Sequence, residues 1–560
     1  MPYRAPVSEL KFVLDKVVGF DRVAATDRFA EATPETVDAI LTEAGRMCEE
    51  VLAPLNRAGD LHPAHLENGV VRTSPGFAEG FAAIAEGGWL GMSADPDYGG
   101  MGLPIALTMA VNEMMGSACL SLQLNPLMTQ GQIEALEAHA SPEIQALYIP
   151  KLISGEWCGT MNLTEPQAGS DVGALRSRAE PNGDGTYAVT GQKIYISWGD
   201  NDFSGNICHL VLARLPDGAE GTKGISLFMV PKRIPDADGN PGVANTLNVV
   251  SLEHKLGLHG SPTAVMQYDG ATGWLVGEPH KGMAAMFTMM NNARLGVGVQ
   301  GLSIAEAAMQ HAVGYALERR QGRTPDGPED NGCTILQHAD VRRMVLSMKA
   351  DTFAARALAL DCAVALDMAK ATGDADWQAR GAFLTPIAKS FGTDTGIKVA
   401  GDGIQVHGGM GFIEETGAAQ YLRDVRVTAI YEGTNGIQAM DLVGRKLMDG
   451  GAAAFAVLDQ IETTKNDALR DAVSDLRKLT EWMVGQDMQD RFAGSVSYLN
   501  AFARVLGVHY HLKAAESDDA RAPLARFAAG RMLPEALAEM AKARTGAGEL
   551  YAVSNEVIAA

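Results

Sequence analysis

A block of strand-like sequence lies between two stretches of helical periodicity, and this order limits the folds open to the chain. From residue 157 to about residue 280, segments such as GTYAVTGQKIYIS, CHLVLARL and GISLFMVPK have the length and pattern of strands, with turn clusters such as PNGDGT and DADGNPG between them. On both sides, apolar positions recur at helical spacing over longer segments. We therefore expect an α+β fold that is mainly helical, with a small β barrel or sandwich in its middle.

The same patterns divide the chain into five expected segments. The chain begins with an N-terminal extension (1–36), which is followed by a helical domain (37–156) and a β domain (157–280). A helical bundle (281–450) and an additional helical domain (451–560) complete it. The long helical runs after residue 281 suit an antiparallel bundle. Gly450 and Gly451 are the nearest approach to a linker, and the block after them is again rich in Ala, Leu and Glu.

Charge and composition exclude several classes of protein. The net charge is −22, whereas surfaces that bind nucleic acid are usually basic, so no nucleic-acid partner is predicted. The N-terminal MPYRAPVSELKFVL lacks the features of a signal peptide, and no run approaches the ~18 apolar residues of a membrane span. The six scattered cysteines form no C-x-x-C pair and are expected to be reduced and buried, which favours a cytoplasmic protein. The twelve histidines are dispersed, so no metal site is predicted.

One carboxylate occupies an unusual place in the helical region. The stretch YEGTNGIQ, residues 431–438, puts Glu432 between an aromatic residue and a glycine. The apolar positions that follow, from Ile437 to Leu447, have helical spacing, so Glu432 is expected in a turn just ahead of a helix. One explanation for an acid at that place is purely structural: its negative charge interacts favourably with the helix dipole.

A second motif is more specific. LTEPQAGSDVG, residues 163–173, would on its own be a turn leading into a strand, but it resembles the signature loop T-E-P-x-A-G-S-D of the acyl-CoA dehydrogenases, which Thr164–Asp171 match at every fixed position. The resemblance extends over roughly residues 37–447. Further motifs similar to the family's occur in the family's order: PDYGGMG (96–102), GQKIYISWG (191–199), KLGLHGSPT (255–263), ALERRQG (316–322), QVHGGMGF (405–412) and RDVRVTAIYEGTNGIQ (423–438).

The resemblance implies a reaction and a role for Glu432. Acyl-CoA dehydrogenases remove an α-proton and a β-hydride from an acyl-CoA thioester, with FAD as cofactor and commonly an electron-transfer flavoprotein as acceptor. Glu432 matches the catalytic base in the family's Y-E-G-T motif. Burial should raise the pKa of such a carboxylate and strengthen it as a base, while a helix N-terminus lowers the pKa. Some members place the base directly before an arginine instead, but here that position is Ala293, before Arg294.

The resemblance implies FAD binding at eleven positions. Tyr195 and Ser197 replace the more usual Trp and Thr but keep an aromatic face and a hydroxyl, and Trp198 occupies a site that is often Asn. Arg319 is expected to reach the FAD pyrophosphate of a neighbouring subunit, the alternative being a solvated arginine at a helix end. Gly436 departs from the usual polar residue, so one cofactor contact is expected to be absent or replaced. The expected FAD residues are Leu163, Thr164, Ser170, Tyr195, Ser197, Arg319, Gln337, Gln405, Gly408, Gly409 and Thr434.

Substrate contacts are implied at five positions: Ser170, Asn291, Arg294, Tyr431 and Gly433. Asn291 replaces a frequent Asp, and Arg294 could equally be the partner in a structural ion pair. Gly433 lets the substrate approach the backbone closely, because it has no side chain. The Met-rich MFTMMNN, residues 286–292, lies on the helix expected to line the acyl site, although these methionines could simply be core residues.

The N-terminal segment and the additional C-terminal block resemble a subgroup that includes 3-(methylthio)propanoyl-CoA dehydrogenases of bacterial dimethylsulfoniopropionate degradation. The resemblance implies 3-(methylthio)propanoyl-CoA or another short-chain acyl-CoA as substrate. The alternatives are a medium- or long-chain fatty acyl-CoA dehydrogenase, an acyl-CoA oxidase, or a DNA-binding flavoprotein relative, although residues 452–560 contain no basic run. A homo-oligomer is expected. A dimer is favoured, since the additional block could cover the surface through which other members pair their dimers.

Overall fold

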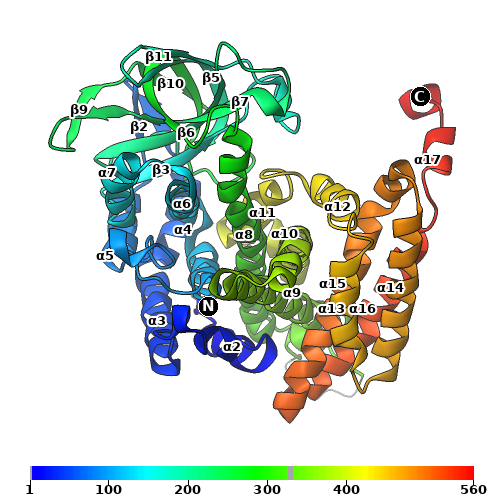
Figure 1. Ribbon diagram of the computed structural model, residues 1–560. Coiled ribbons are helices and arrows are strands. Elements are labelled where there is room, and N and C mark those ends of the chain that lie inside the picture. The colour runs from blue at the N-terminus through cyan, green and yellow to red at the C-terminus, as the bar shows by residue number, and fades with distance from the viewer. Residues whose placement is uncertain (1–2, 326–331) are drawn as a thin grey trace. The chain divides into compact units, whose positions relative to one another are not determined.

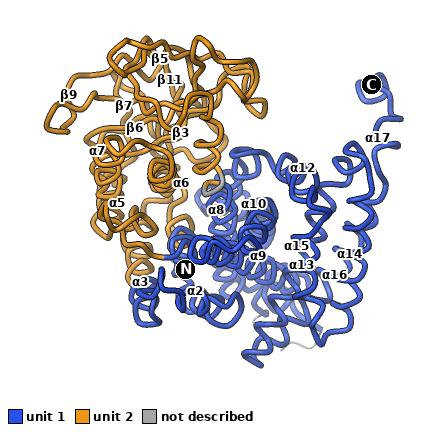
Figure 2. The backbone as a smooth tube through the Cα atoms, in the orientation of Figure 1, with its two compact units in different colours: residues 1–42, 104–113, 294–560 blue, residues 43–103, 114–293 orange. Residues whose placement is uncertain are grey.

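The computed structural model describes residues 3–325 and 332–560, apart from the side chains of residues 291 and 292. The chain forms two compact units (Figure 2). The first unit comprises Met1–Thr42, Pro104–Glu113 and Arg294–Ala560, and the second comprises Glu43–Leu103 and Met114–Ala293. Three helices run from one unit into the other within their own length: α3 (Pro34–Met47), α6 (Ile105–His139) and α8 (Gly282–Glu318).

The second unit is built around a mixed sheet of seven strands (Figure 1). The strands follow the order β10-β11-β5-β4-β6-β3, and β7 pairs with both β11 and β6. These pairings close β11, β5, β4, β6 and β7 into a ring, so of the expected small barrel or sandwich the structure forms a barrel. The strands are β3 (Trp157–Asn162), β4 (Arg178–Pro181), β5 (Tyr187–Ser197), β6 (Asn206–Arg214), β7 (Ile225–Pro231), β10 (Leu247–Leu252) and β11 (Thr263–Val276).

Strand β6 is buried on both faces because its side chains alternate between two cores. Val211 belongs to the core of the ring, together with Phe228 and Tyr268. Leu210 and Leu212 belong to a second core that includes Trp157 and residues of the helices. A strand covered on both sides needs a continuous apolar run, and CHLVLARL supplies one.

The remaining elements of the second unit are mostly helical, as expected, and include α4 (Ala53–Leu61), α5 (Phe77–Glu86) and α7 (Pro142–Ile153). A small hairpin of β1 (His65–Glu67) and β2 (Val70–Arg72) interrupts the region expected to be entirely helical, and the short pair β8 (Arg233–Pro235) and β9 (Pro241–Ala244) extends from the sheet region. Asn68 and Gly69 turn the first hairpin with φ values of 50° and 76°, because an Asn-Gly pair tolerates this left-handed shape.

The regular elements of the first unit are all helices in its described residues, apart from an isolated bridge between Arg320 and Thr334. Its N-terminal segment contains α1 (Val7–Phe12) and α2 (Asp21–Ala24), and its central part contains α9 (Ala339–Thr372), α10 (Ala375–His407), α11 (Ala418–Val425) and α12 (Asn435–Gly444). The C-terminal block adds α13 (Ala452–Glu462), α14 (Asp467–Gly485), α15 (Met488–Ser517) and α16 (Ala522–Ala543), followed by the short α17 (Gly548–Ala552) and α18 (Asn555–Ala559). Helix α15 packs against α9, α12 and α16.

Helices α8 and α10 cross with their backbones in contact within the first unit. A Cβ atom added at Gly301 would lie 2.4 Å from the carbonyl oxygen of Gly392, and one added at Gly396 would lie 2.4 Å from the carbonyl oxygen of Gly301. One added at Gly392 would lie 2.3 Å from the carbonyl oxygen of Gly298. The crossing therefore depends on the absence of side chains, and it fixes the position of α10, which contains Lys389.

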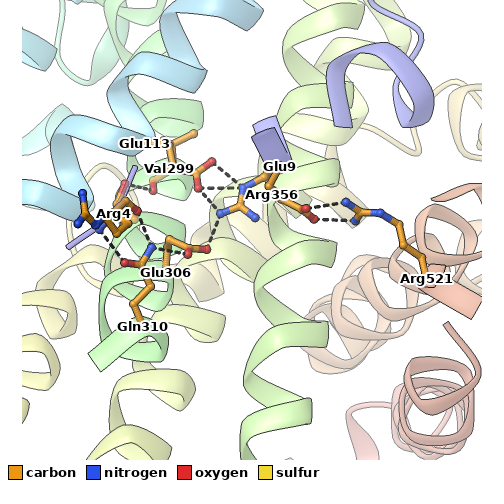
Figure 3. A network of polar contacts seen from close by, with 9 residues as sticks. Arg4, Glu9, Glu113, Val299, Glu306, Gln310, Arg356 and Arg521 are labelled. Carbon is orange, nitrogen blue, oxygen red and sulfur yellow. Dashed lines mark hydrogen bonds and ion pairs between the residues drawn. The ribbon is translucent and has the colours of Figure 1, made fainter. Parts of the chain in front are cut away.

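A buried ion network joins distant segments of the first unit (Figure 3). The Arg356 guanidinium donates to Glu113 at 2.5–3.1 Å and to Glu306 at 2.6 Å, and all three residues are buried. Burial would lower the pKa of Arg356, but the two carboxylates reverse that effect and raise it. Beside this cluster, Arg521 binds Glu9 with two hydrogen bonds of 2.7 and 2.8 Å. The pair ties the N-terminal segment to the C-terminal block.

Helix α6 is the only helix of the described chain that has the length and composition of a membrane span, and 94% of its most apolar window is buried, as in a core helix. All six cysteines are buried free thiols.

Candidate functional site

Glu432 lies in a strained turn immediately before α12, which confirms its expected position. Thr434 caps the helix, and its hydroxyl accepts a hydrogen bond from the Ile437 N–H at 3.3 Å. Glu432 and Gly433 have φ values of 56° and 85°. Glycine adopts this left-handed conformation readily, but for a residue with a Cβ it costs about 1–2 kcal/mol. The surrounding contacts must therefore hold the Glu432 backbone.

Two buried side chains hold the carbonyl groups of this turn. The Gln438 amide nitrogen donates to the Glu432 carbonyl at 3.2 Å and lies 3.4 Å from the Gly433 carbonyl. The Lys389 ammonium donates to the Gly433 carbonyl and to the Asn435 side-chain oxygen, both at 2.9 Å. Lys389 and Gln438 are each 0% exposed. The turn is thus fixed from α12 and from α10.

Asn435 connects these contacts to the rest of α10. Its amide nitrogen donates to Asp394 at 2.8 Å and to the Thr393 hydroxyl at 3.0 Å, while its oxygen accepts from Lys389. The sequence analysis did not identify Lys389, Asn435 or Gln438. The one local signal is the isolated cation in LTPIAKSF, since a lysine within an apolar run has to find buried partners.

The turn creates a carboxylate that titrates near neutrality. Burial raises the pKa of Glu432 to about 7, and the nearby charges of Arg294 and Lys389 oppose that shift. Burial likewise lowers the pKa of Lys389 to about 8, against the attraction of Glu432 and Asp394. A group of this kind can accept a proton at physiological pH.

Three residues expected to contact substrate lie in this region of the first unit. Gly433 and Tyr431 flank Glu432, and the Tyr431 hydroxyl donates to Gln300. Arg294 is buried, influences Glu432 electrostatically, and has a guanidinium nitrogen 3.9 Å from the Asp441 carboxylate. The structure therefore also supplies a partner, Asp441, for the structural ion pair that was the alternative role of Arg294. The side chain of Asn291 lies outside the described residues.

In the second unit, the signature loop and β5 lie side by side. The Ile194 N–H donates to the Thr164 carbonyl at 2.9 Å, which puts Thr164 beside Tyr195. Tyr195 is 61% exposed and has a left-handed backbone, with a φ of 60°. Ser197 is half-buried and Leu163 is buried. Ser170 lies on the exposed part of the loop. This edge presents an aromatic ring and hydroxyl-bearing residues.

Glu165 connects the signature loop to neighbouring segments through its carboxylate, a role that the sequence did not predict. Its carboxylate accepts from the backbone N–H groups of Arg176 at 2.7 Å and Ser177 at 3.0 Å, and from the buried Lys193 at 2.8 Å. Burial alone would raise the pKa of Glu165, but Lys193 and these donors lower it to about 2. The glutamate of the T-E-P motif thus makes the loop rigid.

The remaining FAD positions of the first unit form two exposed groups and the helix cap. The Ile335 N–H donates to the Arg319 carbonyl at 2.8 Å, so Arg319 lies close to the short turn that contains Gln337. The Gln337 side-chain oxygen accepts from the Thr334 N–H at 2.9 Å. Gln405, Gly408 and Gly409 lie at the end of α10, and a Cβ atom at either glycine would meet nothing within 4 Å. Thr434 caps α12.

The expected FAD residues of each unit, taken separately, have side chains that suit part of a dinucleotide flavin. An exposed aromatic ring beside hydroxyl groups suits a flat ring system with polar edges. An exposed arginine suits a diphosphate, and side-chain-free backbone at Gly408 and Gly409 allows close approach to a nucleotide. The donor set therefore agrees with FAD.

Family models match the chain in four consecutive segments. The models "Acyl-CoA dehydrogenase, N-terminal domain", "middle domain" and "C-terminal domain" match residues 34–156, 160–271 and 280–448. A fourth model, "Acetyl-CoA dehydrogenase C-terminal like", matches residues 454–554. The additional helical block thus has its own family model.

Whole-chain comparisons agree. The chain is 45% identical to 3-methylmercaptopropionyl-CoA dehydrogenase of Ruegeria pomeroyi, over 89% of this chain and 88% of that protein. It is 34% identical to a butyryl-CoA dehydrogenase of Syntrophomonas wolfei, over 79% and 75% of the two chains. The solved structure of an acyl-CoA dehydrogenase complexed with FAD from Bacillus anthracis has the same fold, with a TM-score of 0.75, 19% identity, and coverage of 99% and 93%.

Proposed function

The chain belongs to the acyl-CoA dehydrogenase family, and on this premise we propose that it acts on a short acyl-CoA, with Glu432 as the base. The family consists of FAD-dependent oxidoreductases, and the chain is accordingly an FAD-dependent enzyme that converts an acyl-CoA thioester to the trans-2-enoyl-CoA. The proposal concerns the acyl chain and the residues that perform the reaction.

The Glu432 turn is the observation that supports the assignment of the base. The α-hydrogen of a thioester is a weak acid, so its removal requires a carboxylate that is held in place and is not satisfied by a strong ion pair. Glu432 meets this requirement, because burial raises its pKa to about 7 and its backbone carbonyl is held by Gln438. Arg294 and Lys389 limit the rise, so the carboxylate is ionised at slightly alkaline pH.

FAD, when bound, accepts the β-hydrogen of the substrate as a hydride. In the second unit, Thr164, Tyr195 and Ser197 would hold the flavin ring system, and the Glu165–Lys193 pair keeps their loop rigid. In the first unit, Arg319 and Gln337 would bind phosphate and nucleotide groups, with Gln405, Gly408, Gly409 and Thr434 completing the set.

We propose 3-(methylthio)propanoyl-CoA or another short acyl-CoA as substrate. Two relatives support this proposal. One is the 3-methylmercaptopropionyl-CoA dehydrogenase that is 45% identical over most of both chains, and the other is the butyryl-CoA dehydrogenase. A thioether sulfur is weakly polar and similar in size to a methylene, so a pocket for a five-carbon chain could also accept the methylthio compound. Met286 and Met289 are fully buried in a core of the second unit, which favours a packing role for them.

A substrate series tests this proposal. The purified yellow enzyme is assayed by steady-state kcat/KM with butanoyl-, pentanoyl-, 3-(methylthio)propanoyl-, octanoyl- and palmitoyl-CoA and an artificial electron acceptor. We expect comparable values for the first three and a steep fall by palmitoyl-CoA. A maximum at twelve carbons or longer would contradict the short-chain assignment. It would not affect the assignment of Glu432 as the base or of the chain to the family.

We further propose that the protein is a cytoplasmic homodimer that passes its electrons to an electron-transfer flavoprotein. The exposed Arg319 is proposed to reach the FAD of the neighbouring subunit, so Arg319→Ala should weaken FAD retention by roughly 1.5–3 kcal/mol.

Light scattering of the FAD-loaded protein tests the dimer, and a monomer would contradict it. Stoichiometric hydrogen peroxide formation during turnover would instead indicate an oxidase.

A further inference from the structure

Glu432 is held in its conformation by side chains from two helices. Its left-handed backbone is intrinsically unfavourable, and the next residue shares that conformation. A Cβ atom at Gly433 would lie 2.7 Å from the Gln438 amide nitrogen, so this side chain packs directly against the turn. Sparsely populated backbone conformations persist where the surroundings impose them, and they often occur at functional sites.

We propose that Lys389 is a positioning residue for the Glu432 base. Its ammonium holds the Gly433 carbonyl and the Asn435 side chain at 2.9 Å each, and so fixes the turn from which the Glu432 carboxylate projects. The proposal rests on the proposed role of Glu432 as base. Gln438 supports the same turn from α12, through the Glu432 carbonyl.

The surroundings of Lys389 argue for a role beyond packing. Lys389 is 0% exposed, and its ammonium donates hydrogen bonds to two neutral oxygens. A buried cation is costly unless nearby negative charge compensates it. Glu432 and Asp394 are the carboxylates that stabilise its charge. Ionised Glu432, the form that can accept a proton, is therefore also the form that best compensates Lys389.

Other charged groups face this pair from each neighbouring helix. Arg294 on α8 lowers the pKa of both Glu432 and Lys389, and it is itself influenced by Asp441 and Arg445 near the end of α12. Asp394 on α10 accepts a hydrogen bond from Asn435. Because Arg294 remains in every Lys389 variant, removal of Lys389 should shift the Glu432 titration without abolishing it.

Lys389 variants of the FAD-loaded enzyme test the proposal. Lys389→Met removes both the charge and the hydrogen bonds, and Lys389→Gln keeps a hydrogen-bond donor without the charge. With the Met variant we expect kcat to fall by about 100-fold, the scale of a misplaced catalytic group, with little change in KM. The pH midpoint of kcat/KM should move upward in both variants, because a cation that favours ionised Glu432 is lost. The Gln variant should recover part of kcat.

Lys398→Met on the same helix is the matched control. Lys398 is half exposed and pairs with Asp351 at 2.7 Å, away from the Glu432 turn. This variant removes one lysine charge from α10 and should leave the pH midpoint unchanged. FAD content and melting temperature, measured for every variant, separate misfolding from misplacement of the base.

The outcomes distinguish the two proposals. A folded, FAD-loaded Lys389→Met with the parent kcat and pH midpoint would overturn the positioning role, while an inactive Glu432→Gln would leave the base assignment in place. If Lys389→Met does not fold, Lys389→Gln decides, since it is shorter but can still donate a hydrogen bond, and an unshifted midpoint in that variant overturns the proposal. Retained turnover by Glu432→Gln would overturn both.

Discussion

Glu432 and Glu165 differ in what their ionisation does. Burial keeps the pKa of Glu432 near 7, whereas Glu165 is bound by Lys193 and backbone donors that lower its pKa to about 2. The first carboxylate can exchange a proton at physiological pH, and the second remains charged and serves the structure. Two glutamates in different motifs of the same family thus have opposite roles, set by the groups that each one contacts.

Glu432→Gln should retain the fold and FAD but lose nearly all dehydrogenation. The substitution preserves shape and removes the base, and general-base catalysis contributes about 10²–10⁴-fold. The check is anaerobic single-turnover bleaching of the flavin by substrate, with bound FAD quantified beforehand. Turnover within a few-fold of the parent would show that another group takes the proton.

The pH dependence should follow the same carboxylate. Because the ionised form accepts the proton, kcat/KM should rise with pH through about 7. Stability should move in the opposite sense: the pKa is raised from about 4.5 in the unfolded chain, so this residue makes the fold less stable as pH rises from 4.5 to about 7. Chemical denaturation of the parent and of Glu432→Gln across this range measures the difference. Parallel curves would contradict the raised pKa.

At the scale of elements, the crossing of α8 and α10 determines where Lys389 lies. Gly392→Ala would put a methyl group 2.3 Å from the Gly298 carbonyl oxygen, so the helices must move apart. We expect a loss of about 1–3 kcal/mol, as for overpacking in a core, together with a lower kcat because α10 shifts. Thermal unfolding and steady-state kinetics measure both effects.

Gly401→Ala is the matched control on the same helix. A Cβ atom at Gly401 meets nothing within 4 Å, so the substitution should be neutral or should stabilise α10 by up to about 1 kcal/mol through helix propensity. Equal effects of the two substitutions would contradict the close crossing.

The elements were predictable where local pattern decides them. The helix after Glu432 and the apolar strand β6 follow from spacing and composition. The longest strand, β11, did not stand out, because a register shift between Asp269 and Ala271 interrupts its alternation and its glycines resemble turn signals. The β1–β2 hairpin was missed although Asn68-Gly69 is a strong hairpin signal.

The candidate site was predictable in part. A motif identifies Glu432, but its support by Lys389 joins residues far apart in the chain, and no local pattern pairs an α10 lysine with a carbonyl in a later turn. The capping of α12 by Thr434 is local, whereas the functional assignment of Arg294 depends on packing that only the fold supplies. Contacts between distant segments thus account for what the sequence did not reveal.

At the scale of the molecule, the buried Arg356 network should stabilise the first unit strongly against the loss of one member. Arg356→Met leaves Glu113 and Glu306 buried without their cation, and breaking a buried pair typically costs 3–5 kcal/mol. Arg343→Met on the same helix is the control, because its exposed pair with Asp340 contributes about 0–1 kcal/mol. Denaturant unfolding of the two variants compares them, and equal losses would contradict a structural role for the network.

The order of the two units along the chain has a consequence for synthesis. The second unit ends at Ala293, while the first still needs everything up to Arg521 before the N-terminal segment can find its partner. At about 5–20 residues per second, ribosomes take on the order of ten seconds or more over that remaining stretch. During this time Glu9 lacks Arg521 as its partner, so the N-terminal segment can complete its contacts with the C-terminal block only late in synthesis.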